Sequence, residues 1–564
     1  MVDNKSNLIV NLDKKEISLQ VIDRAVTDTN LSSQSSHRMP TPIKPERLQW
    51  YLRGYSPKLS EYLFKGFSEG FRLHNFKFYP IDSDKTLKSA SSRPEIVDKK
   101  LQKELQSNRL LGPFKQSPFK THVISPLGLV PKKDPGEFRV IHHLSYPSGK
   151  SINDGIPREF ATVHYTTISD AIKHIVSFGN DCYLAKSDIK AAFRIIPIHP
   201  MDYHLLGMKW HGLYYFDKCL PMGASSSCSI FERFSTFLEW IIQQKIGNAK
   251  VIHVLDDFLF IARSEFECQR ALDIFLKVMS DIGVPIAPEK TFKPTKYIQF
   301  LGVDLDTQNM LACLPEEKVK KFSDLIDEFL GVKSVTLKKM QSLTGMLNFS
   351  CGVISPGRAF SRRLYNLTIG VQKPYYHIKL SKDVKEDLRV WKRFLHQYNR
   401  KTFFLEKIWN DNLTLKLYTD ASTTIGFGAM FGNSWFYGNW EDQCKGLHIS
   451  ILELYPICVA LDIWGPVLAN KCIHLFCDNI AVVFIVNKFT SKDPYLMKLV
   501  RYLVFTCMKF NILIKATHLC GRLNTIADKL SRGQVQQARA EAPYLEAEPT
   551  RVPPELMLHK LLGI

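Results

Sequence analysis

The alternation of apolar and polar positions predicts two short strands that flank a pair of acids. Mostly apolar residues fill positions 251–255 and 258–262, and Asp256 and Asp257 lie between them. Two strands joined by a two-residue loop form a β-hairpin, so we expect this turn to hold both acids at the tip of a rigid ribbon. A third short apolar run ends in Asp188. The pattern therefore predicts three carboxylates on neighbouring strands.

Three carboxylates in such a place indicate a metal site. Like charges that are packed closely repel each other, and a bound divalent cation neutralises them. Mg²⁺ prefers carboxylate ligands, and a pair of Mg²⁺ ions can catalyse phosphoryl transfer. The alternative for Asp256 and Asp257 alone is a solvated turn, because aspartate is a common turn residue. The additional acid, Asp188, favours the metal site.

Apolar residues at helical spacing predict three helical regions. The first is a lead-in that ends near residue 112, the second follows Gly223, and the third runs from Glu316 to about Gly370. We expect the helix after Gly223 to be core without chemistry. The third region also carries a set of basic residues, namely Lys338, Lys339, Arg358, Arg362 and Arg363.

A second series of acids begins past residue 410. Alternating residues 413–419 predict a strand that runs into an acid, and further strands are predicted at Gly426–Phe431, 435–440 and 473–477. Any one acid in this region alone is more simply a solvated surface group. The series consists of one acid at the end of the first strand, one in a helical pattern, one after the fourth strand and one on a late helix: Asp420, Glu453, Asp478 and Asp528.

Composition narrows the class of function. The chain has 564 residues, of which 45% are hydrophobic, so it is long enough for several domains with real cores. Its 75 basic and 55 acidic residues give a formal charge of +20. That charge suits a polyanionic partner, although a generic basic protein with a solvated surface would carry it too. The 12 cysteines form no C-x-x-C pair, which argues against a zinc knuckle or a disulfide frame and for a reduced compartment.

No N-terminal signal pattern is found, and no stretch of about 20 residues is apolar and free of charge. We therefore expect a soluble intracellular protein, cytoplasmic or nuclear or both, with no membrane partner. The predicted divisions are a disordered arm at 1–45, a helical lead-in at 46–112, an α/β region at 113–311, a helical segment at 312–370, a connection at 371–411, a second α/β domain at 412–532 and a tail of low structure signal at 533–564.

The first series of motifs resembles the reverse transcriptases. Asp188 with Phe193 is similar to that family's first catalytic motif, residues 220–225 to its substrate-positioning motif, and residues 254–257 to its paired-aspartate box. The resemblance implies a right-hand polymerase with fingers and palm at 113–311 and a thumb whose basic residues face the duplex. Three further segments resemble the fingers hairpin, the lysine motif and the primer-grip hairpin: residues 130–139, 289–290 and 300–302.

The resemblance also implies a role for each residue of this site. Asp188 and Asp256 would hold two Mg²⁺ ions, with Asp257 as a weaker ligand and Mn²⁺ as an alternative metal. Phe193 would pack under the sugar and exclude a 2′-hydroxyl, and its alternative is an ordinary core aromatic. For the two lysines at the hairpin tip the alternative is a solvated surface. The residues implied to bind the deoxynucleoside triphosphate are Lys132, Lys133, Arg139, Met222, Gly223 and Lys290.

The second series resembles ribonuclease H over about 120 residues. The resemblance implies that its four acids hold a second pair of Mg²⁺ ions against an RNA strand, with water as the nucleophile. His518 lies ten positions before Asp528 on an expected mobile loop, where it would move protons or help the product leave; a plain surface histidine is the alternative. Together the resemblances imply an α/β multidomain protein, a right-hand polymerase followed by a ribonuclease H-like α/β domain.

The implied activity is that of a retrotransposon enzyme: an RNA-directed and DNA-directed DNA polymerase that is also an endonucleolytic ribonuclease of RNA–DNA hybrids. Its implied partners are an RNA template, a DNA primer, the hybrid and deoxynucleoside triphosphates. Two residues depart from the common family pattern, because glutamine is frequent where this chain has Met222 and an aromatic is frequent where it has Val254. We expect these departures to alter substrate handling without abolishing activity.

Several runs point to a subgroup. Residues 125–133, 138–145 and 231–235 most resemble the DIRS-like retrotransposons, which integrate with a tyrosine recombinase. That recombinase would be a separately encoded partner. Two alternatives stay open: a catalytically silent, host-adopted nucleic-acid-binding relic of such a polymerase, and a fragment of a gypsy-like or pararetroviral polymerase.

Overall fold

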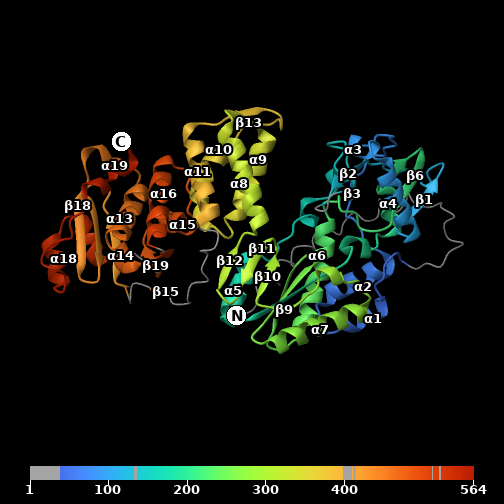
Figure 1. The fold of residues 1–564 in the computed structure, drawn as a ribbon, viewed down its shortest axis with the longest axis horizontal. Helices are drawn as coiled ribbons and strands as arrows, with labels where there is room; N and C mark the ends of the chain where they lie inside the picture. Colours follow the sequence, from blue (N-terminus) through green and yellow to red (C-terminus); the bar gives the residue numbers. More distant parts are fainter. Residues whose placement is uncertain are drawn as a thin grey trace. The chain divides into compact units, whose positions relative to one another are not determined.

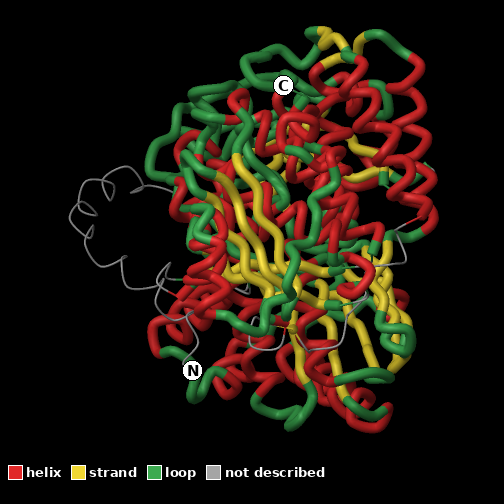
Figure 2. The backbone as a smooth tube through the Cα atoms, turned by 90° about the vertical axis from the view of Figure 1, so that its left-hand side faces the viewer, coloured by secondary structure: helices red, strands yellow, loops and turns green. Residues whose placement is uncertain are grey.

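The structure is a computed structural model, and it describes residues 39–132, 136–397, 409–410, 415–469, 471–510, 512–519 and 523–563. The chain divides into two compact units. Unit 1 comprises residues up to 167 together with 183–295, and unit 2 comprises residues 168–182 together with those from 296 onward. Both units combine helices with strands (Figures 1 and 2), as the predicted α/β class requires.

A four-stranded antiparallel sheet forms the centre of unit 1, with its strands in the order β7, β8, β4, β9. Strands β4, β7 and β8 are short and largely buried, because α6 and α7 cover the sheet, whereas the edge strand β9 is partly exposed. The bounds of these elements are β4 (Tyr183–Asp188), β7 (Lys250–Val254), β8 (Asp257–Ala262), β9 (Phe292–Thr295), α6 (Ser227–Gln243) and α7 (Glu265–Ile282).

The predicted hairpin of β7 and β8 is confirmed, but its turn lies one residue earlier than predicted. Val254 pairs with Asp257, so the two turn residues are Leu255 and Asp256, and Asp257 is already the first residue of β8. Leu255 has a φ of 53°, in the left-handed region that tight hairpin turns require. The expectation that both acids lie in the turn was therefore wrong: one acid is in the turn and the other is in the strand.

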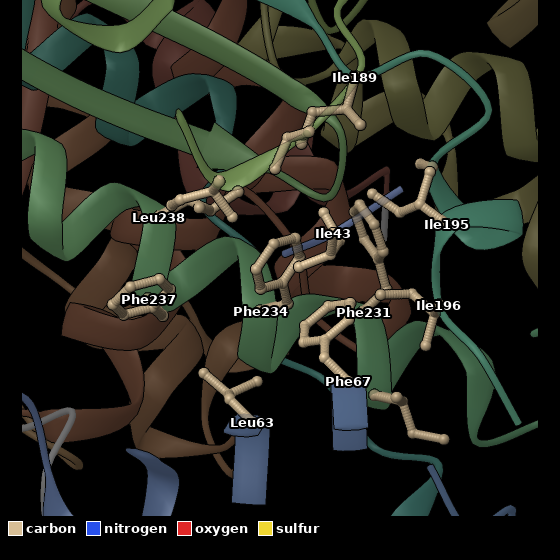
Figure 3. Packing of buried hydrophobic residues seen from close by; sticks show 14 of the residues in the cluster. Ile43, Leu63, Phe67, Ile189, Ile195, Ile196, Phe231, Phe234, Phe237 and Leu238 are labelled. Carbon is tan, nitrogen blue, oxygen red and sulfur yellow. The ribbon is translucent and has the colours of Figure 1, made fainter. Parts of the chain in front are cut away.

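The core of unit 1 lies between α6, α7 and the N-terminal helices. Phe231, Phe234 and Phe237 of α6 are all fully buried at the predicted helical spacing, and Phe67 meets Phe234 edge to face at 4.7 Å (Figure 3). Ile43 is 2% exposed in the same core, although it belongs to the predicted disordered arm. The arm prediction was therefore wrong for residues 39–45; the rest of the arm lies outside the described residues.

The remainder of unit 1 contains a three-stranded sheet in the order β1, β6, β5 and a separate hairpin of β2 and β3. The hairpin pairs Pro131 with Phe138, and residues 133–135 at its tip lie outside the described residues. The elements are α1 (Pro45–Tyr51), α2 (Pro57–Glu69), α3 (Lys88–Ser91), α4 (Pro94–Gln106), β1 (Leu110–Phe114), β2 (Leu127–Pro131), β3 (Phe138–His142), β5 (Gly207–Trp210) and β6 (Leu213–Asp217).

Unit 2 begins with a small antiparallel sheet and a helical bundle. In the bundle, α11 packs against α8, and Lys392 pairs with Asp327 across them at 2.7 Å. The bundle thus continues past residue 370 into the predicted connection. Its elements are α5 (Ile168–Phe178), β10 (Tyr297–Phe300), β11 (Val303–Asp306), β12 (Leu311–Cys313), α8 (Glu316–Gly331), β13 (Ser334–Thr336), α9 (Leu337–Ser350), α10 (Arg362–Asn366), β14 (His377–Lys379) and α11 (Lys382–Gln397).

The rest of unit 2 is an α/β domain. Strands β16, β17 and β18 are antiparallel, and β19 runs parallel to β15 and β20. The first antiparallel strand, β16, begins at Leu417, because Lys416 before it has a left-handed φ of 50°. Residues 413 and 414 of the predicted strand lie outside the described residues. The elements are β15 (Trp409–Asn410), β16 (Leu417–Ala421), β17 (Gly426–Phe431), β18 (Ser434–Asn439), α13 (Ile449–Ile463), α14 (Gly465–Leu468), β19 (Cys472–Cys477), α15 (Ile480–Lys488), α16 (Pro494–Lys509), β20 (Leu513–His518) and α17 (Thr525–Ser531).

The C-terminal tail is ordered against this domain, contrary to the prediction of low structure. Its two helices are α18 (Val535–Glu541) and α19 (Leu558–Leu562). Residues of the tail bury Trp435, whose indole Nε1 donates to the carbonyl of Glu546 at 2.9 Å. No described helix of either unit is both long enough and apolar enough to cross a membrane.

Candidate active sites

Three acids meet where β4 ends and β8 begins in unit 1. Asp188 is the last residue of β4 and pairs directly with Asp257, the first residue of β8. A backbone hydrogen bond also links the end of β4 to the hairpin turn, since the amide of Ile189 donates to the carbonyl of Asp256 at 3.1 Å. Asp188 is 5% exposed, whereas Asp256 and Asp257 are half-buried. The predicted convergence of the three acids is present.

Two lysines compensate the charge of these acids. The Nζ of Lys290 lies 2.9 and 3.0 Å from the two carboxylate oxygens of Asp188, and the Nζ of Lys186 lies 3.1 Å from Asp257. Lys290 was predicted to bind substrate, and here it contacts a carboxylate. Lys186 was missed, although the period of a strand places it on the same face as Asp188 two residues later.

Because the three acids are partly or fully buried, ionising all of them costs free energy, and their pKa values show this. Burial and the nearby Asp188 raise the pKa of Asp256 to about 6. Burial also raises the pKa of Asp188, and the ammonium of Lys290 opposes that rise. A divalent cation would relieve the repulsion among these acids, and carboxylate oxygens are the ligands that Mg²⁺ prefers. The donor set of Asp188, Asp256 and Asp257 therefore fits such an ion.

The loop at 220–225 is held by a residue that sequence reasoning missed. Asn153 donates from Nδ2 to the carbonyl of Gly223 at 2.9 Å and accepts at Oδ1 from the amide of Ser225 at 2.8 Å. A Cβ on Gly223 would meet the carbonyl oxygen of His142 at 2.3 Å, so the close approach requires glycine. Met222 beside it is 49% exposed. No local pattern marked Asn153, because its partners are about 70 residues away.

The remaining predicted nucleotide contacts are placed less tightly. Phe193 is half-buried, and its ring meets Phe231 edge to face at 5.4 Å, so part of it belongs to the core. Lys132 pairs with Glu137 at 2.6 Å across the β2–β3 hairpin, and Arg139 is exposed. Among the described residues, neither cation contacts the three acids. Lys133 lies outside the described residues.

A second group of acids assembles in unit 2. β16 carries Asp420, α13 carries Glu453, Asp478 directly follows β19, and α17 carries Asp528. Asp420 and Glu453 are 5% and 6% exposed. Carboxylate oxygens of Glu453 and Asp478 lie within 4.8 Å of each other and of the Sγ of Cys477. The elements predicted to present these acids are confirmed.

Hydrogen bonds position the second group. The hydroxyl of Ser531 donates to Asp420 at 2.5 Å, and Arg532 donates from Nε to Asp528 at 2.8 Å. Asn524 donates to the carbonyl of Thr419, next to Asp420, at 2.9 Å. All three donors lie on or beside α17, so this short helix supplies both an acid and the groups that hold the first strand's acid in place. Sequence reasoning assigned these donors no role.

The pKa values show how strongly the second group resists full ionisation. Burial and the nearby Asp420 raise the pKa of Glu453 to about 9, and burial raises the pKa of Asp420 to about 6. Burial also raises the pKa of the Cys477 thiol to about 12, which keeps that sulfur protonated and a poor ligand. The usable donors are therefore carboxylate oxygens, and such a hard set fits Mg²⁺.

His518 is the last residue of β20, so its predicted place on a loop was wrong. The strand continues this far because His518 is the partner of Cys477 in the parallel ladder with β19. One ring nitrogen of His518 lies 3.1 Å from the backbone carbonyl of Asp478. The exposed side chain is thus anchored beside the acids.

Comparisons with known proteins identify the first region. Residues 130–305 match the family described as reverse transcriptase (RNA-dependent DNA polymerase). The Pro-Pol polyprotein of Feline foamy virus is 27% identical over 194 residues, which cover 34% of this chain and 16% of that protein. The Pol polyprotein of the gypsy transposon of Drosophila melanogaster is 23% identical over 168 residues, which cover 28% of this chain and 16% of that protein.

A longer match is the putative enzymatic polyprotein of Cassava vein mosaic virus, 21% identical over 369 residues, which cover 62% of this chain and 52% of that protein. The chain thus spans about half the length of this relative and less of the others. A solved structure of the foamy viral protease-reverse transcriptase with double-stranded DNA aligns with a TM-score of 0.47 and 15% identity, covering 86% of this chain and 84% of that one.

Residues 130–305 therefore form a reverse transcriptase domain of the kind found in retroviral and retrotransposon Pol polyproteins. They contain all three acids of the first group. The whole is a mixed α/β chain, in which the matched region is followed by a second α/β domain.

Proposed function

We propose that the protein is an RNA-directed and DNA-directed DNA polymerase with ribonuclease H activity, which copies the RNA of a retrotransposon and degrades the RNA of the resulting hybrid. The observation that carries the proposal is the presence of two separate carboxylate groups, one in each α/β unit. A single catalytic function would need only one of them.

In the first site the chain's residues position a primer end and a deoxynucleoside triphosphate. Two Mg²⁺ ions held by Asp188, Asp256 and Asp257, or Mn²⁺ in their place, would activate the attacking 3′-hydroxyl and stabilise the leaving oxygens. Gly223 lets its loop pack against the carbonyl of His142, and this packing would fix the loop beside the nucleotide. Phe193 limits the space at the 2′ position of the sugar.

In the second site the same type of residue serves a different reaction. Asp420, Glu453, Asp478 and Asp528 would hold a pair of Mg²⁺ ions that activate water against a phosphodiester of RNA. His518 stands beside Asp478 with its ring exposed to solvent, where it would move protons or help the product leave. Recognition of the hybrid would depend on A-like shape and 2′-hydroxyls rather than on base identity.

Within the retrotransposons we propose the DIRS-like group, on the support of residues 125–133, 138–145 and 231–235. A separately encoded tyrosine recombinase would then integrate the DNA. The flanking coding sequence of the element tests this assignment, since a retroviral-type integrase next to this chain would contradict it.

The test of the function uses the full chain with Mg²⁺, a primed RNA template and a labelled RNA–DNA hybrid. Asp256→Asn should abolish primer extension and keep hybrid cleavage, because a neutral amide holds Mg²⁺ poorly. Asp478→Asn should show the reverse. The matched controls are Asp273→Asn in α7 and Asp442→Asn, both exposed acids outside the two groups, and both should leave both activities intact.

Two results would contradict the proposal. Extension at the parental rate by the Asp256→Asn protein would exclude the first site as a polymerase centre. A parent protein that binds primed template yet neither extends nor cleaves would be the silent nucleic-acid-binding relic. A double variant of Asp256 and Asp478 controls for contaminating nuclease or polymerase.

A further inference from the structure

The helical bundle of unit 2 carries a long basic segment that contains no acid of either carboxylate group. Residues 329–382 contain nine lysines and arginines and no aspartate or glutamate. A segment with this charge repels cations and attracts a polyanion. The segment includes β13 and β14, which lie at one end of the bundle (Figure 1).

Two exposed aromatic rings lie within this basic segment. Tyr375 is 65% exposed and Tyr376 is 46% exposed, although burial of such rings would stabilise the fold. The two rings meet at 90° with their centroids 5.3 Å apart, and the Nζ of Lys373 lies 5.4 Å from the ring of Tyr376. Exposed adjacent tyrosines beside a lysine are typical of surfaces that bind a ligand with both a planar ring and a negative charge.

The backbone under the two tyrosines is fixed. The carbonyls of Pro374 and Tyr376 accept from the first two amides of α9, those of Lys338 and Leu337, at 3.0 and 2.8 Å. The amide of Tyr376 donates to the carbonyl of Lys373 at 3.0 Å. A platform that is already ordered loses little conformational entropy when a ligand binds. The rings are thus presented to solvent on a rigid support.

Lysines frame this platform. Lys338, Lys373 and Lys379 are all exposed, and among the described residues no acid pairs with any of them. The one described ion pair of the segment 329–350 joins Lys339 to Glu328. The ammonium of Lys373 lies beside a ring, the backbone amide of Lys338 bonds to Pro374, and Lys379 follows Tyr376 by three residues in β14. Such a set suits both parts of a nucleic-acid strand, since the charges suit its phosphates and the aromatic faces suit its bases.

We propose that Tyr375 and Tyr376, with Lys338, Lys373 and Lys379, form an accessory site for single-stranded nucleic acid. Stacking requires unpaired bases, because the bases of a duplex are already stacked on each other. The site therefore binds an unpaired stretch of RNA or DNA rather than the duplex that either catalytic site acts on. This proposal takes from the proposed function only the assumption that the ligand is a nucleic acid. The site contains no residue of either carboxylate group.

The test measures binding without catalysis. The full chain in chelator, with no divalent metal, is titrated with labelled single strands of about 12 nucleotides, of RNA and of DNA in separate arms, and with a blunt duplex. The double variant Tyr375→Ala/Tyr376→Ala should bind single strands about tenfold more weakly, the loss expected for one stacked base. Its affinity for the duplex should change less than about twofold.

Three variants serve as controls. Tyr375→Phe/Tyr376→Phe should restore binding, because phenylalanine keeps the stacking face. Tyr544→Ala should have no effect: Tyr544 is 49% exposed with Lys416 at 5.6 Å, but Glu541, Glu546 and Glu548 surround it in sequence. Lys373→Gln/Lys379→Gln should reduce the slope of log affinity against log salt concentration by about 0.7 for each phosphate that is no longer neutralised.

Three outcomes would overturn the proposal: unchanged single-strand affinity in the alanine variant, equal weakening for single strand and duplex, and failure of the phenylalanine pair to restore binding. If the alanine variant is misfolded, the site is tested on the parent protein instead. Photo-crosslinking of a 4-thiouridine single strand should then label the peptide that contains Tyr375 and Tyr376, and its absence among the labelled peptides overturns the site. These results do not depend on whether the chain polymerises DNA.

Discussion

The two carboxylate groups deal with their own charge in opposite ways. In unit 1 each strand-end acid has a lysine at hand, with Lys290 on Asp188 and Lys186 on Asp257. In unit 2 the deepest acids, Asp420 and Glu453, receive hydrogen bonds and burial but no ammonium group among the described residues. Glu453 of the second group, with a pKa of about 9, therefore holds a proton that metal must displace, whereas Asp256 of the first group, with a pKa of about 6, is mostly ionised at neutral pH.

This difference follows from what each site has to admit. A polymerase site must accept a triphosphate, so cations near the acids also serve the incoming phosphates. A nuclease site, as proposed for the second group, would hold one phosphodiester of a strand, and the cation of that group, Arg532, contacts Asp528 rather than the buried Asp420 and Glu453. The two sites thus use carboxylates and Mg²⁺ in two different electrostatic environments. Single substitutions should therefore change one activity and leave the other.

The largest effect is expected from Glu453→Gln. Removal of an ionisable metal ligand should lower hybrid cleavage by about a thousandfold, or about 4 kcal/mol, and leave primer extension unchanged. The fold should not suffer, because the glutamate is already neutral when metal is absent. Its pKa of about 9 exceeds the ordinary 4.5, so its ionisation costs the metal-free protein stability as pH rises from 4.5 toward 9.

The measurement pairs activity with thermal unfolding in chelator at pH 5 and at pH 8. The glutamine variant should match the parent at pH 5 and be at least as stable at pH 8. Lower stability of the variant at pH 8 would mean that the Glu453 carboxylate is ionised and paired in the metal-free protein, which removes the contrast between the two groups.

The next largest effect is expected on the discrimination between ribonucleotides and deoxynucleotides. Phe193→Ala should weaken discrimination against ribonucleoside triphosphates by about tenfold to a hundredfold, because it opens space at the 2′ position. Hybrid cleavage should not change, since the second site would contact the sugars of the nucleic acid through residues in another part of the protein. Incorporation of matched ribonucleotides and deoxynucleotides is compared. Unchanged selectivity would return Phe193 to the core, where it already contacts Phe231.

The strand pattern predicted this contrast only in part. Alternation predicted Asp188 at a strand end and Asp257 on a neighbouring hairpin, and the helix after Gly223 was correctly expected to be a core helix. The turn was displaced by one residue, because alternation does not reveal that Leu255 adopts a left-handed φ. The acids were therefore found by sequence, but the exact strand end that carries each one was not.

Long-range contacts explain what the sequence did not reveal. Asn153 supports the loop at Gly223 from about 70 residues away, and no local period marks it. The tail after residue 532 has a weak apolar pattern, yet it is ordered because it covers Trp435. Lys186 is the exception: its position two residues before Asp188 made its contact with the site predictable from strand period alone.

Lys290→Met tests the compensating cation of the first group. The change keeps the apolar stem and removes the charge 2.9 Å from Asp188, so extension should fall about tenfold while cleavage stays constant. Stability should change little, because the side chain of Lys290 is 56% exposed. Steady-state extension and hybrid cleavage are measured on the same preparation. An equal fall in both activities would show a general folding defect and no local role.

The smallest and most specific effect is a difference in how pH changes the Mg²⁺ requirement of the two activities. Metal binding to the second group must release the proton of Glu453, whose pKa is about 9, so the Mg²⁺ concentration for half-maximal cleavage should rise by up to about tenfold for each pH unit below that value. The first group titrates lower, with Asp256 near 6, so the requirement for extension should be nearly constant from pH 7 to 8.5 and rise only below that range. Both activities are titrated with Mg²⁺ across this pH range at constant ionic strength, with Asp442→Asn as the reference protein. Parallel pH dependence of the two requirements would contradict the assignment of lysine compensation to one site and proton retention to the other.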